Sequence, residues 1–282
     1  MMGRRWQQVR QQLRRNRPAQ LALGVLVIFG LASVLAWASP WDPNAMAIES
    51  RMLPPDSQHW FGTDEYGRDY FTRALYGGQI SLMVGGLAML FSTLLGTLVG
   101  TISGYLGGWL DTLLMRAVDM LMSIPAFFLL LVLNAYLKPG IASIILIISA
   151  LNWMSLSRLV RAETLSLKER EYVLYARASA ASSWRIILRH IIPGVLPTVM
   201  VAATLNIASA ILMESTLSFL GLGVQQPNAS WGSMLNNAQA YIGDATWLAL
   251  FPGMLILLTV LGFNVLGDVF RRAFEPGGQR DE

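Results

Sequence analysis

The sequence predicts an all-α, polytopic membrane protein with about six transmembrane helices, on the basis of its composition and its charge pattern. Of the 282 residues, 54% are hydrophobic and only 13% are charged, about half the charged fraction of an ordinary soluble domain. Long uncharged runs alternate with short charged segments, and about 20 apolar helical residues suffice to cross the hydrocarbon of a bilayer. Too little polar sequence remains for a separate globular unit, so we expect a single membrane domain.

Six runs without any charged residue give the expected spans. The second run is long for one crossing, and its glycines (Gly96, Gly100, Gly104, Gly107 and Gly108) indicate a turn at its end. The six runs cover residues 18–41, 74–110, 120–137, 139–157, 191–213 and 245–267.

These runs divide the chain into successive segments. We expect a basic cytoplasmic N-terminal segment (1–18), a first transmembrane helix (19–38) and an extracytoplasmic segment (39–79). A transmembrane core (80–267) and a cytoplasmic tail (268–282) follow. Within the core we expect a cytoplasmic loop at 158–190 and an extracytoplasmic loop at 214–244.

The orientation follows from the basic residues, because Lys and Arg collect in short cytoplasmic loops. With the N-terminus inside, seventeen of the 21 Lys and Arg residues are cytoplasmic. Both termini and the 158–190 loop are therefore expected in the cytoplasm. The basic start and the small residues at 36–38 are also typical of a signal peptide, but the apolar run from 19 to 38 is longer than a signal core, which favours a retained first span.

The composition excludes several kinds of chemistry. There is no Cys, and the two histidines, His59 and His190, are expected on opposite sides of the membrane, so neither a thiolate site nor a histidine metal centre is expected. A phosphate-binding loop needs Gly-Lys-Ser or Gly-Lys-Thr. The only lysines, Lys138 and Lys168, do not follow a Gly. We therefore expect no enzyme activity, no metal and no cofactor in this chain.

The segment 158–190 is richer in small and basic residues than a connecting loop requires. Between 176 and 183 nearly every residue is Ala or Ser, and small residues let another backbone approach closely. Tyr172 and Tyr175 lie beside this patch, and tyrosine is enriched at binding hot spots. The pattern favours a docking surface; the alternative is a solvated helical hairpin whose Arg185 and Arg189 lie near lipid headgroups.

This segment resembles the cytoplasmic coupling loop of ABC importer permeases. In that motif Glu-Ala-Ala is followed by three residues, a Gly, and later a Leu-Pro pair at the start of the next span. Here Leu174-Tyr175-Ala176, Ala180 and Ile192-Pro193 stand at those positions, so the Glu, the first Ala and the Gly are absent. A turn with positive φ suits Gly and is strained for Ala180.

The resemblance implies a helix that docks in a groove of an ATPase subunit, which would hold the ATP and Mg²⁺. The residues implied for this ATPase-coupling helix are Glu171, Tyr172, Val173, Leu174, Tyr175, Ala176, Arg177, Ala178, Ser179, Ala180, Ala181 and Ser182.

Two further stretches make the resemblance more specific. Residues 59–69 with 76–82, and residues 218–224 with 230–235, are similar to signatures of the second (C-type) permease of peptide and nickel importers. This resemblance implies a type I ABC importer transmembrane domain in the bacterial cytoplasmic (inner) membrane. The implied partners are a second homologous permease, two ATPase subunits and an extracytoplasmic substrate-binding protein. Short peptides are the first implied substrate, with nickel chelates or glutathione as alternatives.

Polar residues within or next to the spans are the remaining site candidates. Arg116 and Asp119 are three residues apart and are expected to neutralise one another, and Glu214 is expected to be hydrated at a membrane end. Candidates for lining the pathway are Asn134, Asn152, Asn206 and Met213. Candidates for contact with a binding protein are Asp64, Tyr66, Arg68, Gln226 and Trp231, for which a structural cap on the outer face is the alternative.

Two other classes of membrane protein remain open at this stage. A stand-alone secondary carrier or channel could be built from six spans, but inverted repeats, which such carriers often contain, are not evident. A membrane-embedded enzyme is disfavoured because no nucleophile, base and orienting group gather at one membrane face. Copurification of an ATPase would separate the importer from both.

Overall fold

The computed structural model describes residues 2–138 and 140–274, and within them the prediction of an all-α fold is confirmed. Five helices are long and apolar enough to cross a membrane, or six spans if one bent pair counts as a span. Pro139, the first residue of the fourth uncharged run, and residues 275–282 of the tail lie outside the described residues. The longer helices are α1 (Met2–Arg15), α2 (Arg17–Val34), α3 (Tyr70–Leu106), α4 (Gly108–Ser123), α5 (Ala126–Tyr136), α6 (Ile141–Lys168), α9 (Ile192–Phe219) and α11 (Trp247–Phe274).

Short helices connect these elements. Near the middle of the chain, α7 (Glu171–Ala178) and α8 (Ser183–Ile186) lead through a π-helical turn (Ile187–Ile191) into α9. Beyond α9, α10 (Trp231–Ala238) and a 3₁₀ turn (Gln239–Tyr241) lead to α11. Two further 3₁₀ turns (Ala36–Ala38 and Ile48–Ser50) lie in the segment between α2 and α3.

The starts of the first spans have identifiable caps. Asn16 accepts a hydrogen bond from the amide of Ala19 at 3.3 Å, and Pro18 stands in the first turn of α2, where its missing N–H costs nothing. Asp69 caps α3 by accepting from the amide of Thr72 at 2.7 Å. The helix of the second expected span therefore begins at Tyr70.

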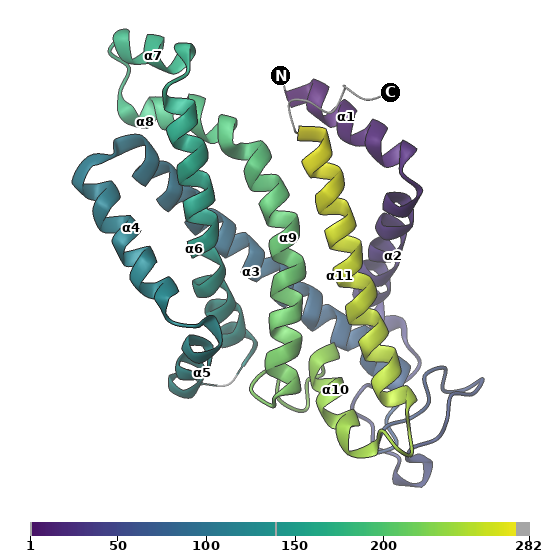
Figure 1. The fold of residues 1–282 in the computed structure, drawn as a ribbon. Coiled ribbons are helices and arrows are strands. Elements are labelled where there is room, and N and C mark those ends of the chain that lie inside the picture. The colour runs from purple at the N-terminus through teal and green to yellow at the C-terminus, as the bar shows by residue number, and fades with distance from the viewer. Residues whose placement is uncertain (1, 139, 275–282) are drawn as a thin grey trace.

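The third span is not one straight helix. The expected run 120–137 is divided between α4 and α5, whose axes differ by 89°. Pro125 lies at the break, where its missing N–H and the clash of its ring with the preceding turn prevent α4 from continuing. Instead of one straight helix, α4 runs down beside α6, and α5 turns sideways below the lower end of α4 (Figure 1).

The glycines of the second run serve two different purposes. Only Gly107 and Gly108, with φ of 67° and 61°, form the turn expected at the end of α3. Gly96, Gly100 and Gly104 lie inside the helix, and a Cβ at Gly100 would come within 2.5 Å of the carbonyl oxygen of Ser157 on α6. These three glycines therefore let α3 and α6 pack backbone to backbone, as small residues spaced by four do in membrane helices.

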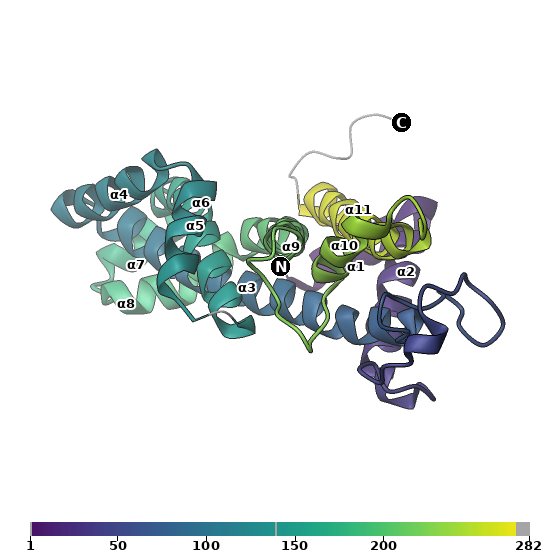
Figure 2. The ribbon, with the colours of Figure 1, turned by 90° about the horizontal axis from the view of Figure 1, so that it is seen from below.

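The helices form an elongated bundle with two distinct ends. In Figure 1, α1, α7 and the last described turn of α11 lie at one end, and α5, α10 and the segment 39–69 lie at the other. We refer to these as the α7 end and the α10 end. Figure 2 shows α3 running across the molecule, from the group that holds α4, α6, α7 and α8 to the group that holds α2, α10 and α11. The shared position of α1, α7 and the end of α11 agrees with the expected grouping of the basic segments.

Candidate functional site

The expected coupling segment forms α7 and the turn that follows it. Val173 is fully buried and packs in a cluster with Ile186 and Ile187, which holds one side of the helix against the bundle. Tyr172, Leu174 and Tyr175 are exposed, and Tyr175 has the largest exposed fraction, 76%. The helix is thus held along one side and presents aromatic and apolar side chains on the other.

An open groove runs between α7 and the residues that precede α9. Its volume is about 800 Å³, and the rings of Tyr172 and His190 face one another across it at 6.0 Å between centroids. One wall is made of small side chains, which leave the groove wide. The lining residues are Glu171, Tyr172, Tyr175, Ala176, Ser179, Ala181 and His190.

The end of α7 has the backbone geometry that the sequence indicated. Ala180 has φ of +55°, in the left-handed region that the coupling-loop motif fills with Gly. The amide of Ala181 donates to the carbonyl of Ala176 at 3.2 Å, and that of Ala180 donates to Arg177 at 2.9 Å. These bonds close a Schellman-type turn that redirects the chain toward α8.

A second contact ties α7 to the long helix α3. The guanidinium of Arg177 lies over the ring of Tyr105, 5.0 Å from its centroid, near the end of α3. Cation–π contacts of this kind are worth about 0.5–2 kcal/mol, depending on exposure. This contact connects α7 to α3 in addition to the spans that flank the loop. Of the other residues in the expected coupling segment, the structure leaves Glu171, Ala178, Ser179 and Ser182 exposed and Ala181 half-buried.

The four candidates for lining the pathway lie on three helices. Asn134 is on α5, Asn152 on α6, and Asn206 and Met213 on α9; all four are half-buried. The side-chain nitrogen of Asn152 is enclosed without a hydrogen-bond partner among the described residues. Their role stays a prediction.

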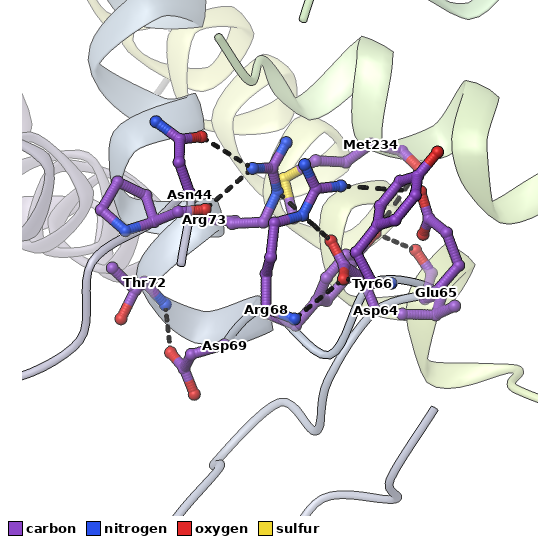
Figure 3. Close-up of polar contacts among 12 residues, drawn as sticks. Asn44, Asp64, Glu65, Tyr66, Arg68, Asp69, Thr72, Arg73 and Met234 are labelled. Atoms are coloured by element: carbon purple, nitrogen blue, oxygen red, sulfur yellow. Dashed lines mark hydrogen bonds and ion pairs between the residues drawn. The ribbon is translucent and has the colours of Figure 1, made fainter. Parts of the chain in front are cut away.

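At the α10 end, a compact polar cluster holds the segment before α3. The carboxylate of Asp64 accepts from Arg68 Nε at 2.6 Å and from the amides of Tyr66 and Arg68 at 2.9 and 3.0 Å (Figure 3). Arg73 lies 3.6 Å from the same carboxylate and donates to the carbonyl of Pro43 at 2.8 Å. Both arginines are almost completely buried. We call this cluster the cap; its burial is consistent with the structural alternative, and the choice between the two roles stays a prediction.

The candidates for contact with a binding protein therefore have different positions. Asp64 and Arg68 are enclosed in the cap, and Trp231 is buried with its indole N–H donating to the carbonyl of Ala74 at 2.9 Å. Tyr66 is half-exposed and Gln226 is exposed. Only these two offer a side chain to a protein approaching the α10 end, and such a contact remains a prediction.

Glu214 is not hydrated as expected, because its side chain is fully buried. Its carboxylate accepts hydrogen bonds from Ser81 on α3 at 3.1 Å and from Ser218 at 2.7 Å. Ser81 also accepts from the amide of Trp231 at 3.2 Å. Ser218 stands four residues after Glu214, so this contact could have been found from helical spacing, whereas the contact with Ser81 on α3 could not. The cage joins α3, α9 and the start of α10.

The expected pair between Arg116 and Asp119 is replaced by a contact between helices. Asp119 on α4 pairs with Arg158 on α6, and the side chains of both are nearly half exposed. Nearer the α7 end, Asp111 on α4 accepts hydrogen bonds from Arg161 on α6 through both carboxylate oxygens, at 2.6 and 2.7 Å. Sequence spacing reveals pairs within a helix but not the partner that a neighbouring helix supplies, so both contacts were missed.

Among residues 2–138 and 140–274, no group of three or more His, Cys, Asp or Glu side chains could hold a metal ion. The structure has an open groove at the α7 end and a buried polar cluster at the α10 end.

Comparisons with known proteins agree with this description. Residues 96–278 match the family described as the inner membrane component of binding-protein-dependent transport systems. Residues 4–55 match the N-terminal transmembrane domain of oligopeptide transport permease C.

Individual relatives are similar over most of their length. The dipeptide transport system permease of Bacillus subtilis is 39% identical over 267 residues, covering 94% of this chain and 83% of the relative. The corresponding protein of Alkalihalophilus pseudofirmus is 39% identical, with coverage of 96% and 90%. A protein of Escherichia coli named as a probable D,D-dipeptide transport system permease is 40% identical, with coverage of 94% and 91%.

Proposed function

This chain belongs to the family of peptide and dipeptide transport permeases, the inner membrane components of binding-protein-dependent ABC transport systems, and we propose that it couples ATP hydrolysis in separate subunits to peptide import. In this proposal, a second homologous permease completes the pathway and two ATPase subunits bind the ATP and Mg²⁺. A substrate-binding protein delivers the peptide at the α10 end. Both chain termini and α7 face the cytoplasm of a bacterial cell, as the distribution of basic residues supports.

The observation that carries the proposal is the geometry of α7. Tyr175 is 76% exposed beside an open groove, while Val173 of the same short helix is fully buried. A large exposed aromatic side chain on a fixed element has the properties of an interface anchor. Closure of the ATPase subunits would push on α7 and, through Arg177 and Tyr105, on α3.

The substrate follows from the relatives rather than from the groove. Relatives of 39–40% identity are named for dipeptide transport, which supports short peptides as the cargo. Import of a nickel chelate or of glutathione is possible with the same architecture and is the second candidate. Asn134, Asn152, Asn206 and Met213 would line the pathway in either case.

The test is copurification and ATPase activity of the complex with Tyr175 changed to Ala. The expected result is loss of the ATPase subunits, or of their stimulation by peptide-loaded binding protein. Tyr136→Ala is the matched control, because Tyr136 is 86% exposed but lies on α5, away from the α7 end. If no ATPase copurifies with the wild type, and peptide flux is undiminished in Tyr175→Ala and in Ala180→Trp, the proposal is refuted and a secondary carrier is favoured.

A further inference from the structure

The helix α1 is basic and ends directly before the first expected span. No Asp or Glu occurs before Asp42, whereas six Arg residues stand between Met2 and Pro18. Four of them are exposed and form what we call the α1 basic surface: Arg10, Arg14, Arg15 and Arg17. None of these four forms an ion pair with any residue in 2–138 or 140–274. The α1 basic surface therefore carries positive charge that this part of the chain does not balance.

The direction of α1 is fixed where it meets α2. Only Asn16 separates the two helices, and its side chain accepts from the amide of Ala19 at 3.3 Å. The side-chain nitrogen of Gln20 on α2 donates to the carbonyls of Leu13 and Arg14 at 3.1 and 2.8 Å. These are carbonyls that the end of α1 leaves without a partner inside the helix. Both sides of the junction are thus hydrogen-bonded, which holds α1 at one angle to the span.

The apolar side of α1 packs against the last described turns of α11. Val9 is buried in a cluster with Ala19, Val269 and Ala273, and Leu13, one turn further along α1, packs against this cluster. In Figure 1, α1 runs across the end of the bundle, whereas α2 and α11 run along it. The apolar side of α1 is therefore occupied by this chain, and its other sides are free for a partner.

The arginines lie on those other sides. Arg10 and Arg14 are four residues apart and share one flank of α1, because residues at this spacing lie above one another on a helix. Arg15 follows Arg14 by one position and is turned by about 100° away from that flank. Arg17 is the first residue of α2. The positive charge thus surrounds the junction between α1 and the first span.

The length of α2 places this junction at the level of the lipid headgroups. Arg17–Val34 is apolar enough to cross a membrane and has 18 residues, so at 1.5 Å per residue it is about 27 Å long. The hydrocarbon of a bilayer is about 30 Å thick. A helix of this length crosses it only when both helix ends lie at the hydrocarbon edges. Arg17 is therefore at such an edge, with Arg14 and Arg15 directly before it in the chain.

We propose that the α1 basic surface binds the headgroup phosphates of anionic phospholipids, with α1 lying at the membrane surface beside the first span. A guanidinium binds phosphate through two parallel N–H···O bonds, and a bilayer that contains anionic lipids attracts arginines next to a span. Headgroups are favoured over an acidic protein surface because Arg17 begins the span itself, where lipid is the adjacent anion. The inference depends neither on the cargo nor on the ATPase subunits.

The first test measures which lipids the complex retains. Immobilised complex is washed with detergent that contains equal amounts of phosphatidylglycerol and phosphatidylcholine with the same acyl chains, and the lipids that elute with the protein are quantified by mass spectrometry. The wild type should retain more phosphatidylglycerol. Each Arg near an anionic surface contributes about fivefold, so the preference should fall by about fivefold or more in Arg14→Gln/Arg15→Gln. Gln has nearly the helix propensity of Arg, so α1 should still form.

Two further double variants serve as controls. Arg51→Gln/Arg170→Gln removes the same charge from two exposed arginines that are distant from α1 in the chain and form no ion pair within the described ranges, and it should keep the wild-type preference. Arg14→Lys/Arg15→Lys should keep most of it, because Lys also binds phosphate as a point charge. No preference in the wild type, or an equal loss in the two Gln variants, would overturn the assignment of lipid to α1.

The second test separates lipid from a protein partner. ATPase subunits that copurify with the wild type should copurify equally with Arg14→Gln/Arg15→Gln. Their loss from this variant, with an unchanged lipid preference, would show that the α1 basic surface binds a protein and would overturn the proposal. A wash at about 1 M salt shortens the screening length from about 10 Å at 0.1 M to about 3 Å, so it should lower the wild-type preference toward that of the variant. A preference unaffected by salt would contradict binding through exposed charges.

Discussion

The amide of Ala181 donates a hydrogen bond to the carbonyl of Ala176 at 3.2 Å, closing the turn that ends α7 around Ala180 at φ of +55°. An L-residue in this conformation costs about 1–2 kcal/mol, a cost that Gly does not carry. We expect Ala180→Gly to stabilise the turn by about 1 kcal/mol, allowing for the greater freedom of Gly in the unfolded chain. The measurement is limited proteolysis of the loop between α6 and α9 in the purified complex.

The neighbouring residue Ala178 supplies the control for this prediction. It is exposed and lies within α7, where Gly is less favourable than Ala by about 0.5–1 kcal/mol. Ala178→Gly should therefore make the loop more susceptible to the protease. A loss of resistance in Ala180→Gly as large as that in Ala178→Gly would contradict the importance of the backbone angle.

The packing of α3 on α6 gives a second prediction. A Cβ at Gly100 would lie 2.5 Å from the carbonyl oxygen of Ser157 and 2.8 Å from Cβ of Val160. Overpacking of this kind costs about 1–3 kcal/mol, so Gly100→Ala should lower the thermal stability of the detergent-solubilised protein. The check is the melting temperature followed by size-exclusion chromatography after heating.

Gly86 is the matched control on the same helix, because no atom lies within 4 Å of the position its Cβ would take. Gly86→Ala should leave stability unchanged or raise it by up to about 1 kcal/mol through helix propensity. If both substitutions lower the melting temperature equally, close packing at Gly100 is not what stabilises the helix pair.

The fold and part of the site could be predicted from local sequence signals. Uncharged runs give the spans because the cost of burying charge acts residue by residue. The sequence also indicated a helix with exposed tyrosines in this loop, because the Ala-Ser patch, the tyrosines and the position of Ala180 lie within a dozen residues. Its coupling role stays a prediction. The structure adds to this prediction the burial of Val173 and the contact between Arg177 and Tyr105, which depend on a distant helix.

What could not be predicted depends on contacts between segments far apart in the chain. Hydropathy treats residues 120–137 as one run, whereas Pro125 lies at the sharp bend between α4 and α5. From the sequence, Glu214 is expected to be a hydrated carboxylate at a membrane end. In the structure, the four hydroxyl groups that bind it come partly from α3 and the start of α10. Likewise Asp119 finds its partner Arg158 on another helix, 39 residues away.

The loop between α9 and α10 gives a third prediction. Ser218 donates to Glu214 and accepts from the amide of Val224 at 3.0 Å, so the chain folds back tightly over the end of α9. A Cβ at Gly223 would lie within 2.5 Å of the backbone nitrogen of Ser218. Gly223→Ala should therefore displace the loop, expose Glu214 and lower the yield of folded protein by a stability loss of about 3 kcal/mol or more.

Gly243 lies in the connection that leads to α11 and serves as the control for this loop. Nothing lies within 4 Å of the position of its Cβ, and its φ is not in the left-handed region. Gly243→Ala should express and fold as the wild type does. Wild-type yield and melting temperature for Gly223→Ala would show that the loop has more room than its backbone contacts indicate.

The cap at the α10 end gives a prediction about pH, since burial raises the pKa of the Glu65 carboxyl above its ordinary value of 4.5, and the nearby Asp64 adds to this effect. The folded state then binds the proton of Glu65 more tightly than the unfolded state does. Its contribution to stability is complete below about pH 4.5 and is lost as the pH rises through the folded-state pKa. Glu65→Gln cannot ionise, so melting temperatures measured from about pH 4 to 8 should show the variant gaining on the wild type as the pH rises.

Asp56, in the same segment, provides a control of opposite sign. Its carboxylate accepts from the amides of His59 and Gln58 at 2.6 and 2.8 Å, and these bonds lower its pKa below the ordinary value of 3.8. Ionised Asp56 therefore contributes stability that is present above about pH 3.8 and is lost as the pH falls through the folded-state pKa. Asp56→Asn should lose stability relative to the wild type at neutral pH and approach it in acid, the reverse of Glu65→Gln. If the melting temperatures of both variants, relative to the wild type, change in the same direction with pH, the cause is the charge of the whole cap and not the burial of Glu65.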